Sequence, residues 1–339
     1  MTFESVSFLI FNVPLQVNAC RLLLLFRFNT NKMRFTVLLA ASWFAFAACQ
    51  NQESDETVST AEQEVPQLLC TTSIMADWVS NLAPAHMEVR SLLQKGVDPH
   101  VYKPGKADLD ALRQADVILY HGVHLEGKII DVLEKMQGTT VIDAASQVPD
   151  SLIVADANFP ASKDPHYWFD PLVVRYTLEH ISAQLSAQYP AYQEEIETNL
   201  ENYLREIDAT ADSVQKILYV LPEDRRIVVT THDALSYFAR AFGLTVKTLQ
   251  GASTVSSFGL REITELVNFI CENGVPTIFL ENIVSPQSME SVQRGCEKKG
   301  CSVTLGPELL SDSLGNETDQ DTYLEMLLFN ATTLVKYLQ

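Results

Sequence analysis

From Gln67 onward, the chain alternates short apolar runs with amphipathic stretches, and this alternation restricts the fold more than any other feature of the sequence. Such a pattern is typical of βαβ units, in which strands pair in parallel and helices cover the sheet. The expected strands are residues 68–71, 89–93, 117–120, 140–142, 227–230, 246–249, 277–280 and 302–305. The expected helices are residues 75–82, 108–115, 125–136, 172–189, 192–220, 234–242, 260–273, 287–299 and 323–337. We therefore predict an α/β fold.

A long helix in the middle of the chain divides the strands into two groups of four. Its apolar residues recur every three or four positions and form one stripe: Ile196, Leu200, Leu204, Ile207, Ala211, Val214 and Leu218. At the standard rise this helix is about 40 Å long. We predict that residues 191–220 join an N-terminal lobe, residues 68–190, to a C-terminal lobe, residues 221–339, each with a mostly parallel four-stranded sheet. The alternative is an ordinary surface helix of one large domain.

The residues before the first expected strand have the features of an export signal. Arg34 and the apolar run 35–48 stop at Cys49, and a run of about fourteen residues is too short to span a bilayer. We interpret residues 33–48 as a lipoprotein signal peptide, Cys49 as the lipidated residue and residues 1–32 as an upstream extension outside the native protein. Residues 49–67 are acidic and polar, which predicts a flexible tether.

The formal charge of −19 narrows the class of partner. Nucleic acid and anionic lipid head groups attract lysine and arginine, so neither is expected to bind this chain. Small cations suit an acidic protein better.

The tripeptide Asp-Pro-His occurs twice, at residues 98–100 and 164–166. Proline fixes its own φ angle and favours an extended conformation for the residue before it, so each tripeptide is a stiff corner that presents a histidine from a loop. Residues 98–100 follow an expected strand, at the sheet edge where α/β proteins bind ligands. His232 and Asp312 also follow strands. We expect His100, His166, His232 and Asp312 to converge on one metal ion, although an Asp-Pro turn also occurs without any ligand.

Three imidazoles and one carboxylate suit Zn²⁺. Four protein ligands leave little room for a substrate, and the sequence lacks a His-Glu-x-x-His helix, so we expect a binding protein and no enzyme. The expected partners of the distal imidazole nitrogens are Asp98, Asp164, Asp170 and Glu281. His121 and His124 are interpreted as loop histidines at the rim of the cleft, with a second metal site as the alternative.

The cysteines add one further expectation. In an exported protein, Cys296 and Cys301 could bridge across a helix-to-strand turn, and the sequence leaves open whether this disulfide forms. Cys70 is expected to be a buried apolar residue.

Several short segments together resemble the metal-binding solute receptors of bacterial zinc and manganese ABC transporters, many of which are lipoproteins. The matching segments are residues 71–77 (TTSIMAD), 96–100 (GVDPH), 115–118 (ADVI), 164–168 (DPHYW), 232–238 (HDALSYF) and 311–315 (SDSLG). The resemblance implies two lobes joined by a long helix, one metal ion held by His100, His166, His232 and Asp312, and a permease and an ATPase as partners.

The resemblance also bears on the metal. Family members that favour manganese or iron tend to carry glutamate at the third ligand position, where this chain has His232, so zinc is the first expectation. Many zinc members have a histidine-rich acidic loop before the second ligand. Residues 147–165 contain no histidine, which leaves Mn²⁺ open.

These observations predict a monomeric, lipid-anchored receptor on the periplasmic or cell-surface side of a membrane, which captures Zn²⁺ and passes it to an ABC transporter. A manganese or iron receptor, a zinc hydrolase, and an adhesin or scaffold with a structural metal are the alternatives. Because imidazoles must be neutral to bind, metal affinity is expected to fall below about pH 6.

Overall fold

The computed structural model describes residues 65–156 and 161–339. The expected export signal, Cys49 and most of the expected tether therefore lie outside the described residues. None of the helices in the described part of the chain combines the length and the apolar character that a bilayer crossing needs.

The first lobe is built on one parallel sheet with the strand order β2-β1-β3-β4. Leu68 in the central strand β1 is paired with Val89 of β2 on one side and Val117 of β3 on the other. The elements are β1 (Gln67–Cys70), α1 (Ser73–Leu82), β2 (Glu88–Ser91), α2 (Lys106–Gln114), β3 (Val117–Tyr120), α3 (Ile130–Leu133) and β4 (Thr140–Asp143). Because every strand is parallel, all four carboxyl ends lie at the same edge of the sheet.

The second lobe holds two parallel strand pairs, β5-β6 and β7-β8. Its elements are β5 (Ile227–Thr230), α6 (Ser236–Phe242), β6 (Thr245–Thr248), α7 (Leu260–Asn273), β7 (Thr277–Glu281), α8 (Gln287–Lys299), β8 (Thr304–Leu309) and α9 (Tyr323–Leu338). The sequence predicts one four-stranded sheet here. The structure instead has two separate hydrogen-bonded pairs, although β5 lies beside β7. At the end of β5 the link to β7 is a side chain, since Glu281 accepts hydrogen bonds from the backbone N–H groups of Thr231 and His232.

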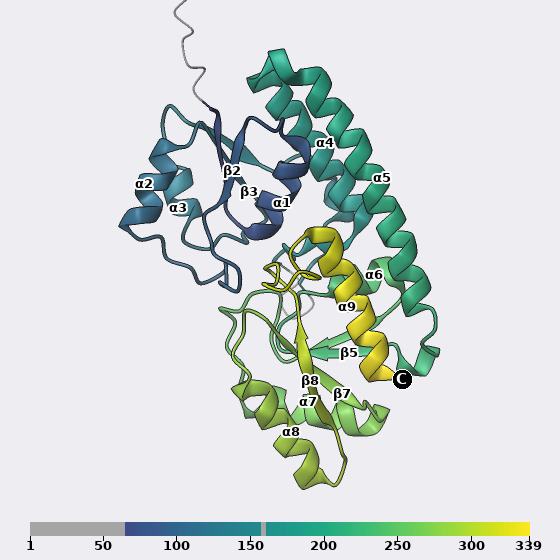
Figure 1. Ribbon diagram of the computed structural model, residues 1–339. Helices are drawn as coiled ribbons and strands as arrows, with labels where there is room; N and C mark the ends of the chain where they lie inside the picture. The colour runs from purple at the N-terminus through teal and green to yellow at the C-terminus, as the bar shows by residue number, and fades with distance from the viewer. Residues whose placement is uncertain (1–64, 157–160) are drawn as a thin grey trace, which may run out of the picture. The chain divides into compact units, whose positions relative to one another are not determined.

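Two helices follow the sheet of the first lobe: α4 (Pro171–Gln188), which ends that lobe, and the long α5 (Gln193–Leu218). Short 3₁₀ turns lie at Asp150–Leu152, Tyr167–Phe169, Pro190–Tyr192 and Glu223–Arg225. The predicted apolar stripe of α5 faces inward, and α5 packs against α1 of the first lobe and α9 of the second (Figure 1). The expected α/β fold, with a long helix joining two lobes, is confirmed.

One predicted helix is much shorter in the structure. Residues 125–136 contain only α3, because Glu126 is used to hold the preceding loop. Its carboxylate accepts hydrogen bonds from the backbone N–H groups of His121 and Gly122. Gly127 lies so close to the carbonyl oxygen of His100 that a Cβ atom there would be 2.2 Å from it, so the loop is tied to the segment that carries His100.

One hydrophobic core runs through both lobes. It includes Trp78 of α1, Val228 of β5 and Tyr323 of α9, all fully buried. Trp168 lies between the lobes, where its indole N–H donates to the carbonyl of Ser311 at 3.0 Å and its own carbonyl accepts from the Tyr323 hydroxyl at 2.6 Å. Trp168 and Phe169 are both fully buried and therefore anchor their loop in the core.

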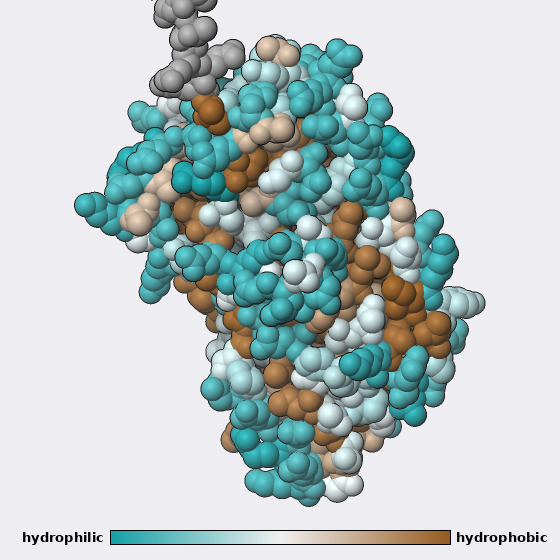
Figure 2. All heavy atoms as spheres, in the orientation of Figure 1, coloured by the Kyte–Doolittle hydropathy of each residue, from teal (hydrophilic) through white to brown (hydrophobic). Residues whose placement is uncertain are grey.

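On the face shown in Figure 2, hydrophobic residues appear as small groups among hydrophilic ones.

The disulfide between Cys296 and Cys301, which the sequence left open, does not form. Cys301 is bonded to Cys271 of α7, with 5.5 Å between their Cα atoms, and Cys296 is a free, buried thiol. The bond forms across the packed helices α7 and α8, because Cys271 lies in the last turn of α7 next to the turn that follows α8. Cys70 is buried, as expected, and burial raises the pKa of its thiol.

Replacing Cys301 by serine should lower the free energy of unfolding by about 2–4 kcal/mol, because the disulfide closes a loop of 30 residues in the unfolded chain. Chemical denaturation measures the change. Reduction of the wild type should cause a similar loss and leave Cys301→Ser unaffected. A wild type equally stable before and after reduction contradicts the assignment.

Candidate metal centre

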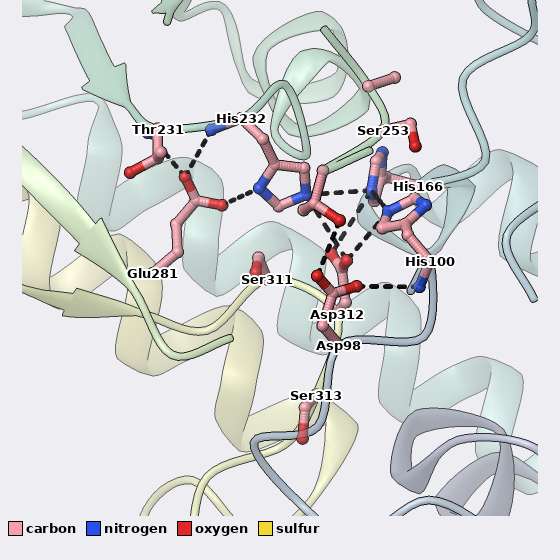
Figure 3. A network of polar contacts seen from close by, with 12 residues as sticks. Asp98, His100, His166, Thr231, His232, Ser253, Glu281, Ser311, Asp312 and Ser313 are labelled. Carbon is pink, nitrogen blue, oxygen red and sulfur yellow. Dashed lines mark hydrogen bonds and ion pairs between the residues drawn. The ribbon is translucent and has the colours of Figure 1, made fainter. Parts of the chain in front are cut away.

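The four predicted ligands come from four separate loops and meet at one point. His100 follows β2, His166 precedes the 3₁₀ turn Tyr167–Phe169, His232 follows β5 directly, and Asp312 follows β8. Figure 3 shows the three imidazole rings and the Asp312 carboxylate pointing toward one another. The carboxyl ends of strands from both lobes thus supply the site, which is the edge where open α/β sheets bind their ligands.

The two Asp-Pro-His segments share one local structure. Asp98 Oδ1 accepts a hydrogen bond from the backbone N–H of His100 at 2.8 Å, and Asp164 Oδ1 accepts one from His166 at 2.9 Å. An aspartate that binds the N–H two residues ahead makes a turn of its own, and the proline between them stiffens it. Each tripeptide is therefore a preformed support for one histidine.

The distances between ligand atoms match a tetrahedral cation site. The Nε2 atom of His166 lies 3.3 Å from Nε2 of His100 and 3.3 Å from Nε2 of His232. Asp312 oxygens lie 3.2 Å, 3.4 Å and 3.5 Å from Nε2 of His100, His166 and His232. Ligand atoms about 2.0–2.1 Å from a tetrahedral ion lie about 3.3–3.4 Å from one another.

The carboxylate of Asp312 has an electrostatic need for a cation. The residue is 1% exposed, and neither of its oxygens has a regular hydrogen-bond partner among the described residues. Its near polar neighbours are the three imidazole nitrogens. A buried carboxylate without donors is costly unless it binds a metal ion or a protonated base, and this site can supply either.

Two further carboxylates fix the orientation of two imidazoles. Nδ1 of His166 lies 2.6 Å from Asp164 Oδ1, and Nδ1 of His232 contacts Glu281 Oε2. A proton held on Nδ1 by a carboxylate leaves the Nε2 lone pair free for the shared centre. Asp164 and Glu281 therefore have the supporting role that the sequence predicts.

The other two predicted supports act differently. One oxygen of Asp98 accepts a hydrogen bond from the backbone of His100 and not from its imidazole. The second oxygen of Asp98 accepts a hydrogen bond from the Thr254 hydroxyl at 2.7 Å. Asp170 caps α4 through the N–H of Leu172 and forms an ion pair with Arg240, so it lies away from the imidazoles. The role of Thr254 was missed, because no sequence pattern connects it with a residue 156 positions earlier.

His121 is a core residue, so its predicted position at the rim is wrong. It is fully buried, with Nε2 2.8 Å from the Thr72 hydroxyl and Nδ1 3.2 Å from the Tyr167 hydroxyl. Burial lowers its pKa to about 3, so the ring is neutral. His124 is exposed and, together with His100, lines a cavity of about 570 Å³, as expected for a rim residue. Neither histidine belongs to a metal-sized cluster among the described residues.

The electrostatics of the site couple metal binding to protons. Burial lowers the pKa of His166, but the Asp312 and Asp164 carboxylates outweigh this effect and raise it to about 9. Burial also opposes protonation of His232, and Glu281 and Asp312 raise its pKa well above the usual value. Burial raises the pKa of Asp312, but His232 and His166 hold it well below its usual range. Without metal, the upward pKa shifts of His166 and His232 favour their protonated forms, so protons compete with the metal ion for these imidazoles.

Comparison with known proteins shows the family. The sequence profile of the zinc-uptake complex component A, periplasmic, matches residues 68–337. The chain belongs to this family. The manganese-binding lipoprotein MntA of Bacillus subtilis is 37% identical over 307 residues, covering 89% of this chain and 99% of MntA.

A second relative is known from both its sequence and its solved structure. The zinc-binding protein TroA of Treponema pallidum is 34% identical over 274 residues, covering 80% of this chain and 88% of TroA. The solved periplasmic zinc-binding protein TroA superposes with a TM-score of 0.77 at 34% identity, covering 81% of this chain and 99% of that chain. The two-lobed fold of this family member therefore matches that of a known metal-binding relative.

Metal affinity should rise with pH up to at least pH 9, since His166, with a pKa of about 9, and His232 must lose protons to bind. This range lies above the limit of about pH 6 that unperturbed histidines predict. Competition titrations with a chelator, repeated at several pH values, measure the affinity. Its dependence on pH should correspond to the release of between about one and two protons per ion. An affinity that is constant from pH 5 to 8 would contradict imidazole ligation.

Replacing Glu281 by glutamine should weaken metal binding by roughly 10- to 100-fold, because the amide cannot hold the Nδ1 proton of His232 as a carboxylate does. Isothermal titration measures the loss. Glu308→Gln, an exposed residue of the neighbouring strand β8, is the matched control and should bind like the wild type. Equal affinities in the two variants would remove Glu281 from the site.

Proposed function

We propose that this protein is an extracytoplasmic receptor that binds one Zn²⁺ ion through His100, His166, His232 and Asp312 and delivers it to an ABC import transporter. The observation that carries the proposal is the convergence of three imidazole nitrogens and the Asp312 carboxylate, from both lobes, with separations of 3.2–3.5 Å that are close to those of a tetrahedral site. Three nitrogen ligands of borderline softness and one carboxylate suit zinc.

Manganese is the second candidate, and one observation favours it. Asp312 turns both oxygens toward the imidazoles: Oδ2 faces His100 and His232, and Oδ1 faces His166. A carboxylate that binds through both oxygens raises the ligand number to five and adds oxygen character, which suits Mn²⁺ better than four ligands do. The relative MntA is named as manganese-binding.

The proposed role involves no reaction. Four ligands from the protein surround the centre, whereas a catalytic zinc keeps a position open for water. A hydrolase with the same ligands would turn over ester, amide or phosphate substrates when loaded with zinc, and the receptor would not. A scaffold with a structural metal would unfold on chelation. A receptor should stay folded and lose only the stabilisation that its ligand adds.

The location and partners extend the proposal. We propose that residues 33–48 are removed and that Cys49 carries a lipid, as the name lipoprotein states for MntA. Residues 49–67 then tether the folded part of the protein to the membrane, on its outer side. This folded part consists of the lobes 68–190 and 221–339, which residues 191–220 join. The partners are a permease and an ATPase, and the receptor acts as a monomer.

Replacing His232 by alanine should remove metal binding, since the variant loses one of four ligands and leaves Glu281 buried without its imidazole. Elemental analysis and thermal unfolding with Zn²⁺ and with Mn²⁺ measure the effect. The wild type should retain about one ion and unfold at a higher temperature when loaded, and the larger shift identifies the preferred metal.

The matched control is His86→Ala, an exposed histidine that packs on Tyr192. This variant should keep the metal-induced shift of the wild type. Equal shifts in the wild type and in His232→Ala would overturn the ligand assignment.

A further inference from the structure

A second group of potential metal ligands lies around helices α7 and α8 of the second lobe. The sulfur atoms of Cys271, Cys296 and Cys301 all lie within 4.8 Å of one another. Cys271 and Cys301 form the disulfide, and Cys296 is the free thiol beside it. Cys296 belongs to a separate hydrophobic cluster built around α7 and α8, which shares no residue with the core around His166.

The backbone holds Cys296 and Cys301 together independently of the disulfide. Gly300 ends α8 in the left-handed region, at φ 89°, and turns the chain back on itself. The N–H of Cys301 then donates to the carbonyl of Cys296 at 3.1 Å, and the Cys301 sulfur lies 3.5 Å from the same oxygen. These contacts keep the two sulfurs close when the disulfide is open.

Helix packing keeps the third sulfur in place. Cys271 lies in the last turn of α7, and α7 packs along α8. Gly295 of α8 lies so close to Val267 of α7 that a Cβ atom there would be 2.7 Å from the valine side chain. The two helices are therefore in close contact just before Cys296, and opening the disulfide removes no part of this interface.

The spacing suits a soft cation. Sulfur ligands about 2.3 Å from a tetrahedral zinc lie about 3.8 Å apart, so sulfurs within 4.8 Å reach such a site by small side-chain movements. Cys296 is fully buried, whereas Cys271 and Cys301 are half-buried, so an ion can arrive from their side and keep a water as its fourth ligand. Burial raises the pKa of the Cys296 thiol, with Lys299 opposing, but a bound cation deprotonates a coordinating thiol.

We propose that Cys271, Cys296 and Cys301 form a second cation site that opens when the disulfide is reduced and binds Zn²⁺ or a similar thiophilic divalent ion. A dithiol reductant transfers two electrons and two protons to the disulfide: the bond between the two sulfurs breaks, Cys271 and Cys301 become thiols, and the reductant becomes a disulfide. The divalent ion then binds three thiolates and releases three protons to solvent. In the oxidised protein the site is closed.

The test uses Co²⁺ with the full chain, before and after reduction by a dithiol that is then removed without oxygen. Cobalt bound to thiolates absorbs in the near ultraviolet, and the site of His100, His166, His232 and Asp312 contains no sulfur. The oxidised protein should bind about one ion without this absorption, and the reduced protein about two ions with it. Reduced protein that lacks the absorption, or a disulfide that resists the dithiol, would overturn the proposal.

Variants assign the absorption to these cysteines. Reduced Cys296→Ser should lose the second ion. Because Cys296 is proposed as a direct ligand, the affinity for this ion should fall by more than the roughly 10- to 100-fold that is typical when a residue that only supports a ligand is replaced. Cys296→Ala is the substitute if serine disturbs the core. Cys70→Ser, a buried thiol of the first lobe, is the matched control and should behave as the wild type. Unchanged absorption in both Cys296 variants contradicts the proposal. His232→Ala should keep it, so a failure of the proposed function is separately visible.

Discussion

The buried carboxylate of Asp312 is the group on which the rest of the site depends. It lies 1% exposed among three imidazoles, and among the described residues its oxygens have no regular hydrogen-bond donors. A negative charge in this position needs positive charge close by, from a metal ion or from protons on the imidazoles. The raised pKa values of His166, to about 9, and of His232 correspond to the second solution, and the spacing of the ligand atoms shows how the first replaces it.

Buried glutamates organise the loops after the strands in both lobes. Glu126 accepts the backbone N–H groups of His121 and Gly122 after β3, and Glu281 accepts those of Thr231 and His232 after β5. Only the second of this pair also contacts an imidazole of the site. The same way of closing a loop thus gives a neutral core histidine in one lobe and a ligand-bearing loop in the other. The difference lies in which group the second carboxylate oxygen meets.

The sequence predicted what depends on local pattern. Periodicity predicted the strands and the long α5, and the repeated Asp-Pro-His and the positions after strands predicted the four residues that meet. What failed depends on contacts between distant residues. The helix expected at 125–136 is short because Glu126 binds a loop, and Cys301 pairs with Cys271 because α7 packs on α8. His121 looks like His124 in the sequence, but only the tertiary structure buries one ring against Thr72 and Tyr167 and leaves the other exposed.

The proton-holding imidazoles have a consequence for the empty receptor. With a divalent ion bound, the carboxylates of Asp164, Glu281 and Asp312 leave one net negative charge at the centre. With protons on His166 and His232 instead, the net charge is the same. When the ion departs and each of these two imidazoles takes up one proton, positive charge is exchanged at the centre without a net change.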